Sequence, residues 1–336
     1  MRITTQMISN RYLTDATRNL NSLQTINRQL TTGKEISRPS DNPYKVARSM
    51  QLNTDLNTNV QYKTNIKDAI NWLDTTDESL NQASSCITRI RTLMVASGNA
   101  GYGTDERKAI ADEINERVAE LGQILNGNFN GKYIFGGTKT ASTPVSVQTN
   151  STGNKYIVYA DKDSNPIFDE SGDLIPPTTQ AQAMADNYLK NMDSALSTEI
   201  SQGVIMDYNV TVADIMNYPT DKNYDVMSLL SEITNNLVSD DETKRAKVIG
   251  ENLDEIDKVL SNILSLRAEV GAKQNRMESA ESKNEDDSFN MTDILSRNED
   301  IDFTEKTIQY ATAQTIYQAC LQVSAQILPK SLLDYL

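Results

Sequence analysis

The 336-residue sequence contains no histidine. Histidine is the side chain best suited to acid–base chemistry near neutral pH, and it is the commonest protein ligand of metals. Its absence removes the Ser-His and Cys-His nucleophile pairs and most transition-metal sites. Carboxylates are numerous, but nothing in the sequence places a pair of them in a cleft. We therefore predict a protein that is not an enzyme and that uses no cofactor or metal.

Cysteine is also scarce, and both cysteines fall on apolar faces of predicted helices. Cys86 and Cys320 belong to no CxxC pair, and no histidine is present to activate them. We interpret both as packing thiols.

One segment resembles the start of a calcium-binding loop. It has the spacing Asp161-x-Asp163-x-Asn165. A calcium loop of this kind requires glycine at its sixth position and glutamate at its twelfth, where this sequence has Pro166 and Gly172. A turn is therefore the interpretation that we adopt.

Large apolar groups and long apolar runs are few. Hydrophobic residues make up 38% of the chain and aromatic residues 6%, with a single tryptophan, Trp72. Such a sequence can form narrow helical seams but lacks the material for one thick core. No apolar run approaches the roughly 20 residues that span a bilayer, and the segment Met1–Gln6 lacks the apolar core of a secretory signal. A net charge of −14 argues against nucleic acid and anionic membranes as partners.

Both ends of the sequence carry the apolar spacing of an amphipathic helix. At the C-terminal end, an acidic segment (296–302) leads into a run without glycine or proline that continues to Pro329. At the N-terminal end, a helix predicted from Ser9 to Thr32 stops at Gly33, a residue typical of helix C-terminal ends. The spacing places an apolar stripe along each helix. Our candidate assembly residues on the two helices are Leu13, Leu20, Leu23, Leu30, Phe303, Ile316, Tyr317, Cys320, Val323 and Ile327.

A terminal amphipathic helix needs a partner to cover its apolar stripe. We expect the two terminal helices to pair with each other or with neighbouring subunits. The first 48 residues are mainly basic, and the segment before the last helix is acidic. Opposite charge favours antiparallel pairing of the two ends, although each exposed ion pair contributes little.

Long helices are predicted between the two ends. The segment from Tyr44 to Ser97 lacks glycine and proline, and at ~1.5 Å per residue an unbroken helix of this length would extend roughly 80 Å. A second helical segment is predicted from Val226 to Lys283, followed by an acidic stretch (281–287) that we interpret as a solvated face. The two segments carry heptad-like seams, which are Ile66, Ile70, Leu73, Leu80, Ile87, Ile90 and Met94 in the first and Ile249, Leu253, Ile256, Leu260, Ile263, Val270 and Met277 in the second.

Shorter elements are predicted between the long helices. A further helix follows the loop 98–103 and is capped by Thr104 or Asp105. Asn-Gly turns are predicted in 126–137, around a short strand-like run. The segment 138–224 has strand-like runs separated by turns, and a short helix is plausible at 180–196. The strand-like runs are Val145–Val147, Tyr156–Tyr159, Val204–Met206 and Tyr208–Val212.

These patterns predict a mainly α fold with an inserted β-rich domain. The N- and C-terminal halves form an elongated antiparallel helical bundle or coiled coil. We expect three parts. Residues 1–40 and 297–336 form terminal helical assembly arms, residues 41–137 and 225–296 form the long-helix bundle, and residues 138–224 form the inserted, mainly β domain.

Two segments at opposite ends of the chain resemble the signatures of one family. Gln29–Ile36, followed by Pro39–Pro43, resembles the N-terminal signature of the bacterial flagellin family. Ser296–Glu305 resembles its C-terminal counterpart. Within the family, Met1–Met7, Gly131–Gly137 and the end Ser331–Leu336 are similar to the branch whose members join the flagellar hook to the filament.

The resemblance implies a structural role in the bacterial flagellum without enzymatic activity. It implies export through the flagellar type III apparatus without a cleaved signal peptide, after a cytoplasmic chaperone has bound the C-terminal region. It implies assembly outside the cell into a ring of identical subunits, next to another hook-associated protein and to flagellin. Nucleic acid and membrane insertion are not expected.

Two alternatives remain open from the sequence. The first, within the same family, is a flagellin that forms the filament itself. The second is a helical tip or translocator protein of a type III export system, whose coiled-coil hairpin has similar periodicity.

Overall fold

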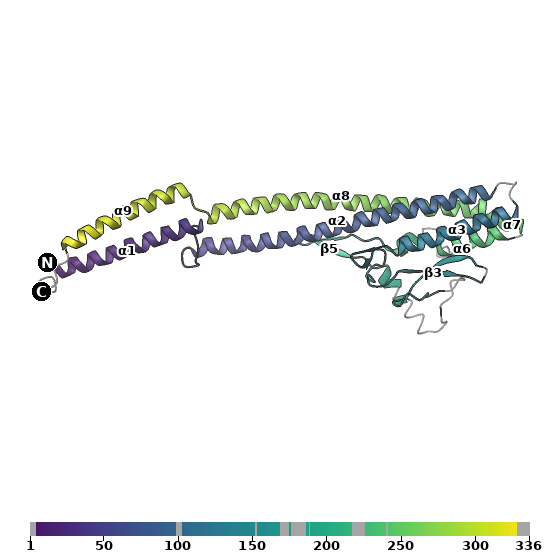
Figure 1. The fold of residues 1–336 in the computed structure, drawn as a ribbon, viewed down its shortest axis with the longest axis horizontal. Coiled ribbons are helices and arrows are strands. Elements are labelled where there is room, and N and C mark those ends of the chain that lie inside the picture. The colour runs from purple at the N-terminus through teal and green to yellow at the C-terminus, as the bar shows by residue number, and fades with distance from the viewer. Residues whose placement is uncertain are drawn as a thin grey trace. The chain divides into compact units, whose positions relative to one another are not determined.

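The computed structural model describes residues 5–98, 103–151, 153–168, 175, 186–187, 189–216, 226–239 and 241–327. The fold is mainly helical with small inserted β hairpins, as predicted (Figure 1). Its contacts divide the chain into a terminal unit, residues 1–60 and 286–336, and a central unit, residues 61–285. The helices are α1 Thr5–Thr32, α2 Pro43–Ser97, α3 Thr104–Leu125, α5 Val212–Met216, α6 Val226–Val238, α7 Glu242–Ile249, α8 Glu251–Glu299 and α9 Phe303–Ile327. The strands are β1 Asn128–Phe129, β2 Lys132–Tyr133, β3 Val145–Thr149, β4 Lys155–Tyr159, β5 Ser197–Ser201 and β6 Val204–Asp207.

In the central unit, α2 and α8 carry the predicted apolar seams. On α2, six of the seven seam residues are buried, and Ile70 is partly buried. On α8, Ile256, Ile263, Val270 and Met277 are buried, whereas Leu253 and Leu260 are partly covered. Ile249 belongs to α7 and is exposed, because the helix is interrupted after it. The heptad spacing therefore predicted the buried faces of both long helices.

The polar positions that interrupt the two seams face each other. Arg267 Nε donates to Asp77 Oδ1 at 3.0 Å and Arg267 Nη2 to Asp77 Oδ2 at 3.3 Å, while Nη1 reaches Asn81 Oδ1 at 3.1 Å. The hydrogen bond that Arg267 donates to Asp77 raises the pKa of Arg267 above its ordinary value. A shift of the helices by one heptad would separate the two charges and leave each without its partner. The pair therefore favours one register of α2 against α8.

One continuous helix was predicted over 226–283, but the structure has three helices there, α6, α7 and the first part of α8. Asp241 caps α7 by accepting from Thr243 N at 2.9 Å, and Gly250 separates α7 from α8. Helix α8 then continues beyond Lys283 to Glu299.

The acidic stretch 281–287 is not only a solvated face. Lys63 pairs with Glu285 at 2.7 Å, and Lys67 pairs with Glu281 at 3.6 Å. Both carboxylates therefore contribute to the contact between α2 and α8 in the central unit.

The start of α3 differs from the prediction that Thr104 or Asp105 caps it. Gly103 is the N-cap residue, and its backbone N–H donates to Glu106 Oε2 at 2.8 Å. The glutamate side chain supplies the capping contact, so Thr104 is already the first helical residue. Helix α3 packs against α6 and β4, and Gly122 allows close approach, because an added Cβ would overlap Val147 Cγ2.

The predicted turns and most of the predicted strands are confirmed. Asn130 and Gly131 have φ of 50° and 76° and connect β1 to β2, while β3 pairs with β4 antiparallel. Strand β5, which was not predicted, pairs with β6, and β6 was predicted. Asp161 Oδ1 accepts from Asp163 N at 2.8 Å and Asn165 N at 2.9 Å, so the segment like a calcium loop is a turn.

The predicted strand Tyr208–Val212 is wrong. Val210 and Val212 are buried, but the segment leads into α5 instead of pairing. Asp214 Oδ2 accepts from Thr211 N at 2.9 Å and Thr211 Oγ1 accepts from Asp214 N at 3.2 Å, which together start the helix. The helix predicted at 180–196 lies largely outside the described residues, and its described part at 189–192 is helical.

Candidate assembly surface

The terminal unit is built around the pairing of α1 with α9, which lie side by side (Figure 1). The Tyr12 hydroxyl donates to the backbone carbonyl of Cys320, and Asn19 Nδ2 contacts Cys320 Sγ at 3.4 Å. Cys320 is therefore part of the contact between the two helices, in keeping with its interpretation as a packing thiol.

The pair covers only part of the two apolar stripes. No described side chain of α1 or α9 is fully buried. Of the candidate assembly residues, Leu20, Leu23, Leu30, Tyr317 and Cys320 are half-buried. The exposed ones are Leu13 (49%), Phe303 (58%), Ile316 (47%) and Val323 (43%), whereas the side chain of Ile327 lies outside the described part of the chain.

A shallow groove of about 350 Å³ runs between the helices. Its apolar lining includes Ile26 of α1 and Ile308 and Ile316 of α9. The prediction omitted Ile26 and Ile308. The spacing of eight residues between Ile308 and Ile316 places them on one helix face and could have identified Ile308.

The two signature-like segments meet in space and form what we call the elbow, residues 33–42 with residues 296–302. Lys34 and Asp300 form an antiparallel bridge. Glu35 N donates to the carbonyl of Glu299 at 2.6 Å, and Ile301 N donates to the carbonyl of Gly33 at 3.1 Å. Gly33 has a φ of +72°, which confirms that α1 ends there in a left-handed turn.

Glu299 is the buried charge of the elbow, with 8% of its surface exposed. Its carboxylate accepts hydrogen bonds from Lys34 Nζ and Ser49 Oγ. The neighbouring Asn298 Nδ2 donates to the carbonyl of Lys45 at 3.0 Å. Burial alone would raise the pKa of Glu299, but the hydrogen bonds from Lys34 and Ser49 and the charge of Lys34 outweigh it and hold the pKa below its ordinary value.

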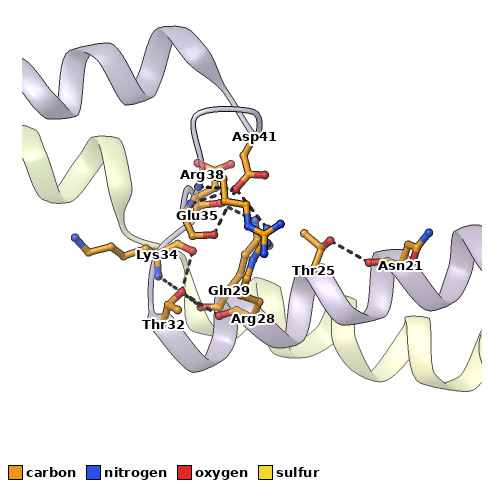
Figure 2. A network of polar contacts seen from close by, with 10 residues as sticks. Asn21, Thr25, Arg28, Gln29, Thr32, Lys34, Glu35, Arg38 and Asp41 are labelled. Atoms are coloured by element: carbon orange, nitrogen blue, oxygen red, sulfur yellow. Dashed lines mark hydrogen bonds and ion pairs between the residues drawn. The ribbon is translucent and has the colours of Figure 1, made fainter.

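The loop side of the elbow is held by a second carboxylate, Asp41 (Figure 2). Asp41 Oδ2 accepts from the backbone N–H of Ser37 at 3.2 Å and of Arg38 at 3.0 Å, and Arg28 Nη2 lies 3.3 Å away. The hydrogen bond from Ser37 N is the largest cause that lowers the pKa of Asp41. Asn42 Oδ1 accepts from Lys45 N at 3.2 Å and caps α2, one of the two caps predicted from the sequence.

The elbow should weaken in acid. Because the pKa of Glu299 is lower in the folded chain, its contribution is complete above the unfolded value near 4.5 and disappears as the pH falls through the folded value. Glu299→Gln should destabilise the terminal unit by roughly 1–3 kcal/mol at neutral pH, and the difference should shrink well below pH 4.5. Thermal unfolding of both proteins across this pH range measures it.

Asp286→Asn is the matched control for Glu299→Gln, because Asp286 is an exposed carboxylate on the same helix and in the same unit. It should leave the unfolding temperature almost unchanged at every pH. Equal destabilisation by the two variants, or a Glu299→Gln effect that persists unchanged in acid, would contradict the role given to Glu299.

The described residues offer no arrangement for catalysis or for holding a metal. No group of three or more acidic, cysteine or histidine side chains gathers among them. The thiol of Cys86 is buried and donates to the carbonyl of Arg117, and burial raises its pKa to about 12. Nor does any described helix combine the length and hydropathy needed to cross a bilayer.

Comparisons with known proteins agree with the signatures at the two ends. The model of the bacterial flagellin N-terminal helical region matches residues 3–140, and that of the C-terminal helical region matches residues 253–336. Flagellar hook-associated protein 3 of Escherichia coli is 24% identical over 329 residues, with 95% of this chain and 94% of that protein covered.

A flagellin of Clostridium tyrobutyricum is also 24% identical, over 373 residues, with 97% and 98% covered. Among solved structures, the flagellar junction protein FlgL from Legionella pneumophila aligns with a TM-score of 0.52 at 16% identity, covering 76% of this chain and 100% of that one. At this identity the structural likeness concerns the fold.

Proposed function

Because this chain belongs to the bacterial flagellin family, whose two helical regions together match about two thirds of it, we propose that it joins the flagellar hook to the filament. It is a structural protein and not an enzyme. The observation that carries the proposal is the elbow, which pairs the two signature segments and holds α1 beside α9 with part of their apolar stripes uncovered.

The junction role is favoured over filament formation by the relatives. A hook-associated protein and a flagellar junction protein both align with this chain over nearly their whole length. Both alignments contain gaps, but about 47 of the 373 positions aligned with the Clostridium flagellin have no residue of this chain, against about 10 of the 329 positions aligned with the Escherichia coli hook-associated protein. A filament-forming flagellin is the second candidate, because its identity to this chain is equally high.

The candidate assembly residues divide into two roles in this proposal. One group holds the helix pair together, because its side chains are half-buried within the pair. This group is Leu20, Leu23, Leu30, Tyr317 and Cys320. The other group contacts neighbouring subunits, because its large or branched apolar side chains are left exposed on the pair. This group is Leu13, Phe303, Ile316 and Val323. Ile327 is assigned to the second group from its place in the sequence pattern alone.

The chain assembles with other flagellar components. More specifically, we propose a ring of identical subunits at the hook–filament junction outside the cell, in contact with a neighbouring hook-associated protein and with flagellin. Before export without a cleaved signal peptide, a cytoplasmic chaperone would bind the C-terminal region, where α9 offers exposed apolar side chains.

Deleting the gene tests the junction role. We expect cells with hooks but without filaments, and flagellin released into the medium, because flagellin would lack the surface on which it assembles. Electron microscopy of the cells and immunoblots of the medium measure this, and the intact gene should restore filaments. Normal filaments in the deletion strain would refute the proposal, and long filaments grown from the purified protein would favour the filament-forming alternative.

A further inference from the structure

A small cavity of about 260 Å³ opens on the central unit. Its walls come from three places in the sequence, which are the α2 segment around Trp72, the β1–β2 hairpin and the β5 region. The hairpin of β5 and β6 is held against α2, since Tyr62 Oη donates to Glu199 Oε1 at 3.2 Å and Asn65 Nδ2 to the Glu199 carbonyl at 3.1 Å. These hydrogen bonds hold two walls of the cavity, α2 and the β5–β6 hairpin, in a fixed position.

Aromatic rings form one part of the cavity wall. Trp72 contacts Phe129 and Tyr208 edge to face, with centroid distances of 6.2 and 5.8 Å. Trp72 is 5% exposed, and its indole nitrogen has no hydrogen-bond acceptor among the described residues. The indole nitrogen itself is enclosed by the protein, so Trp72 contributes the apolar surface of its ring to the cavity wall.

Four polar side chains of the wall form no ion pair or side-chain hydrogen bond within the described part of the chain. Asp68 and Lys132 line the same cavity with opposite charges but form no ion pair with any described residue. Asn130 and Thr198 also line it and have no side-chain hydrogen bond in the described part of the chain. Burial, with a smaller contribution from Asp68, raises the pKa of Tyr208, so its phenol remains a protonated donor. The cavity wall therefore combines aromatic rings with polar donors and acceptors, and the charges of Asp68 and Lys132 cancel.

We propose that this cavity binds a single neutral sugar residue of a glycan. The C–H face of a sugar ring packs against aromatic rings, whose faces carry partial negative charge. Each sugar hydroxyl both donates and accepts, and so can bond Asp68 as acceptor and Lys132 as donor. The cavity lies just below the range of drug-sized pockets, which suits one ring and not an oligosaccharide. This site is independent of the junction role.

Because Trp72 is the only tryptophan, its indole N–H gives a single assignable signal in a ¹⁵N-correlated NMR spectrum. Titration of the whole protein with glucose, galactose, mannose and N-acetylglucosamine should shift this signal for at least one sugar, with roughly millimolar affinity. Asp68→Ala should weaken that binding roughly tenfold, because a hydrogen bond to a charged group is lost. Asp68 is exposed on α2, so this variant should keep the fold.

Asp112→Ala is the matched control, since Asp112 is an exposed carboxylate on another helix of the same unit and lines a different cavity. It should bind sugar as the unchanged protein does. The proposal is overturned if no sugar shifts the indole signal at roughly tens of millimolar, or if the two variants weaken binding equally. It is also overturned if glycylglycine shifts the signal and the sugars do not, because the site would then take a zwitterionic peptide.

Discussion

Gly137→Ala is expected to destabilise the central unit by about 2–4 kcal/mol. Gly137 has a φ of +58°, which strains any residue with a side chain. An added Cβ would also overlap the carbonyl oxygen of Met192 and lie 2.6 Å from that of Asn191. Those carbonyls cannot retreat freely, because Thr138 N and Oγ1 both donate to the Asn191 carbonyl at 2.9 Å. Chemical denaturation monitored by Trp72 fluorescence measures the loss.

Gly131→Ala separates backbone strain from steric overlap. Gly131 has a φ of +76°, but an added Cβ would meet nothing within 4 Å. This variant should therefore cost only about 1 kcal/mol. The difference between the two variants measures the close contact at Gly137. Equal losses would show that the contact with the 191–192 backbone is easily relieved and would contradict the expected result.

The double substitution Ile316→Asp and Val323→Asp is expected to abolish filament attachment while leaving the monomer folded. Both side chains are more than 40% exposed on α9, so the single chain loses little when they change. In an assembly, each would have contributed roughly 1.5–3 kcal/mol by burial, and each aspartate would instead bring an unpaired charge into the contact. Cells carrying the variant should have bare hooks and should not swim. Electron microscopy and swimming assays measure this, and circular dichroism of the purified protein checks the fold.

Thr315→Asp with Gln322→Asp controls for added charge and for the low helix propensity of aspartate. These exposed positions precede Ile316 and Val323 by one residue each and carry no apolar side chain. The control should keep filaments and motility. If both double variants behave alike, or if the Ile316 and Val323 variant swims normally, the exposed row on α9 is not an assembly contact.

Local rules predicted the elements whose ends depend on nearby residues. Gly33 marks the end of α1 because its positive φ is accessible to glycine, and Asn130-Gly131 marks the β1–β2 turn for the same reason. The buried faces of α2 and α8 followed from heptad spacing alone, since period and burial are tied by helix geometry.

Long-range contacts were beyond the same rules. The pairing of Asp77 with Arg267 was not predicted, because spacing within one helix does not give the register of its partner. The strand predicted at Tyr208–Val212 failed because alternation of residue types does not show whether a partner strand lies alongside. Residues 209–212 are all buried, and the segment contacts Trp72 and then enters α5.

The candidate assembly residues show the same limit. The stripe of Ile316, Cys320, Val323 and Ile327 was identified by its steps of four, three and four, but of its described members only Cys320 is among the half-buried side chains of α9, which in the described part are Lys306, Gln309, Tyr310, Ala313, Tyr317 and Cys320. Periodicity predicts an apolar row on α9, but the face of α9 that packs against α1 depends also on the side chains of α1. Only the structure distinguishes the row used within the chain from the row left free.

The ion pair of Lys34 with Glu299 joins residues 265 positions apart. Because translation starts at the N-terminus, Lys34 is made long before Glu299, and most of the chain must be synthesised before this ion pair can form. A nascent chain cut short anywhere before that glutamate would keep the carbonyl of Gly33 and the amide of Glu35 without their partners. These contacts can therefore form only in a chain that has been translated as far as residue 301, and a shorter fragment lacks them.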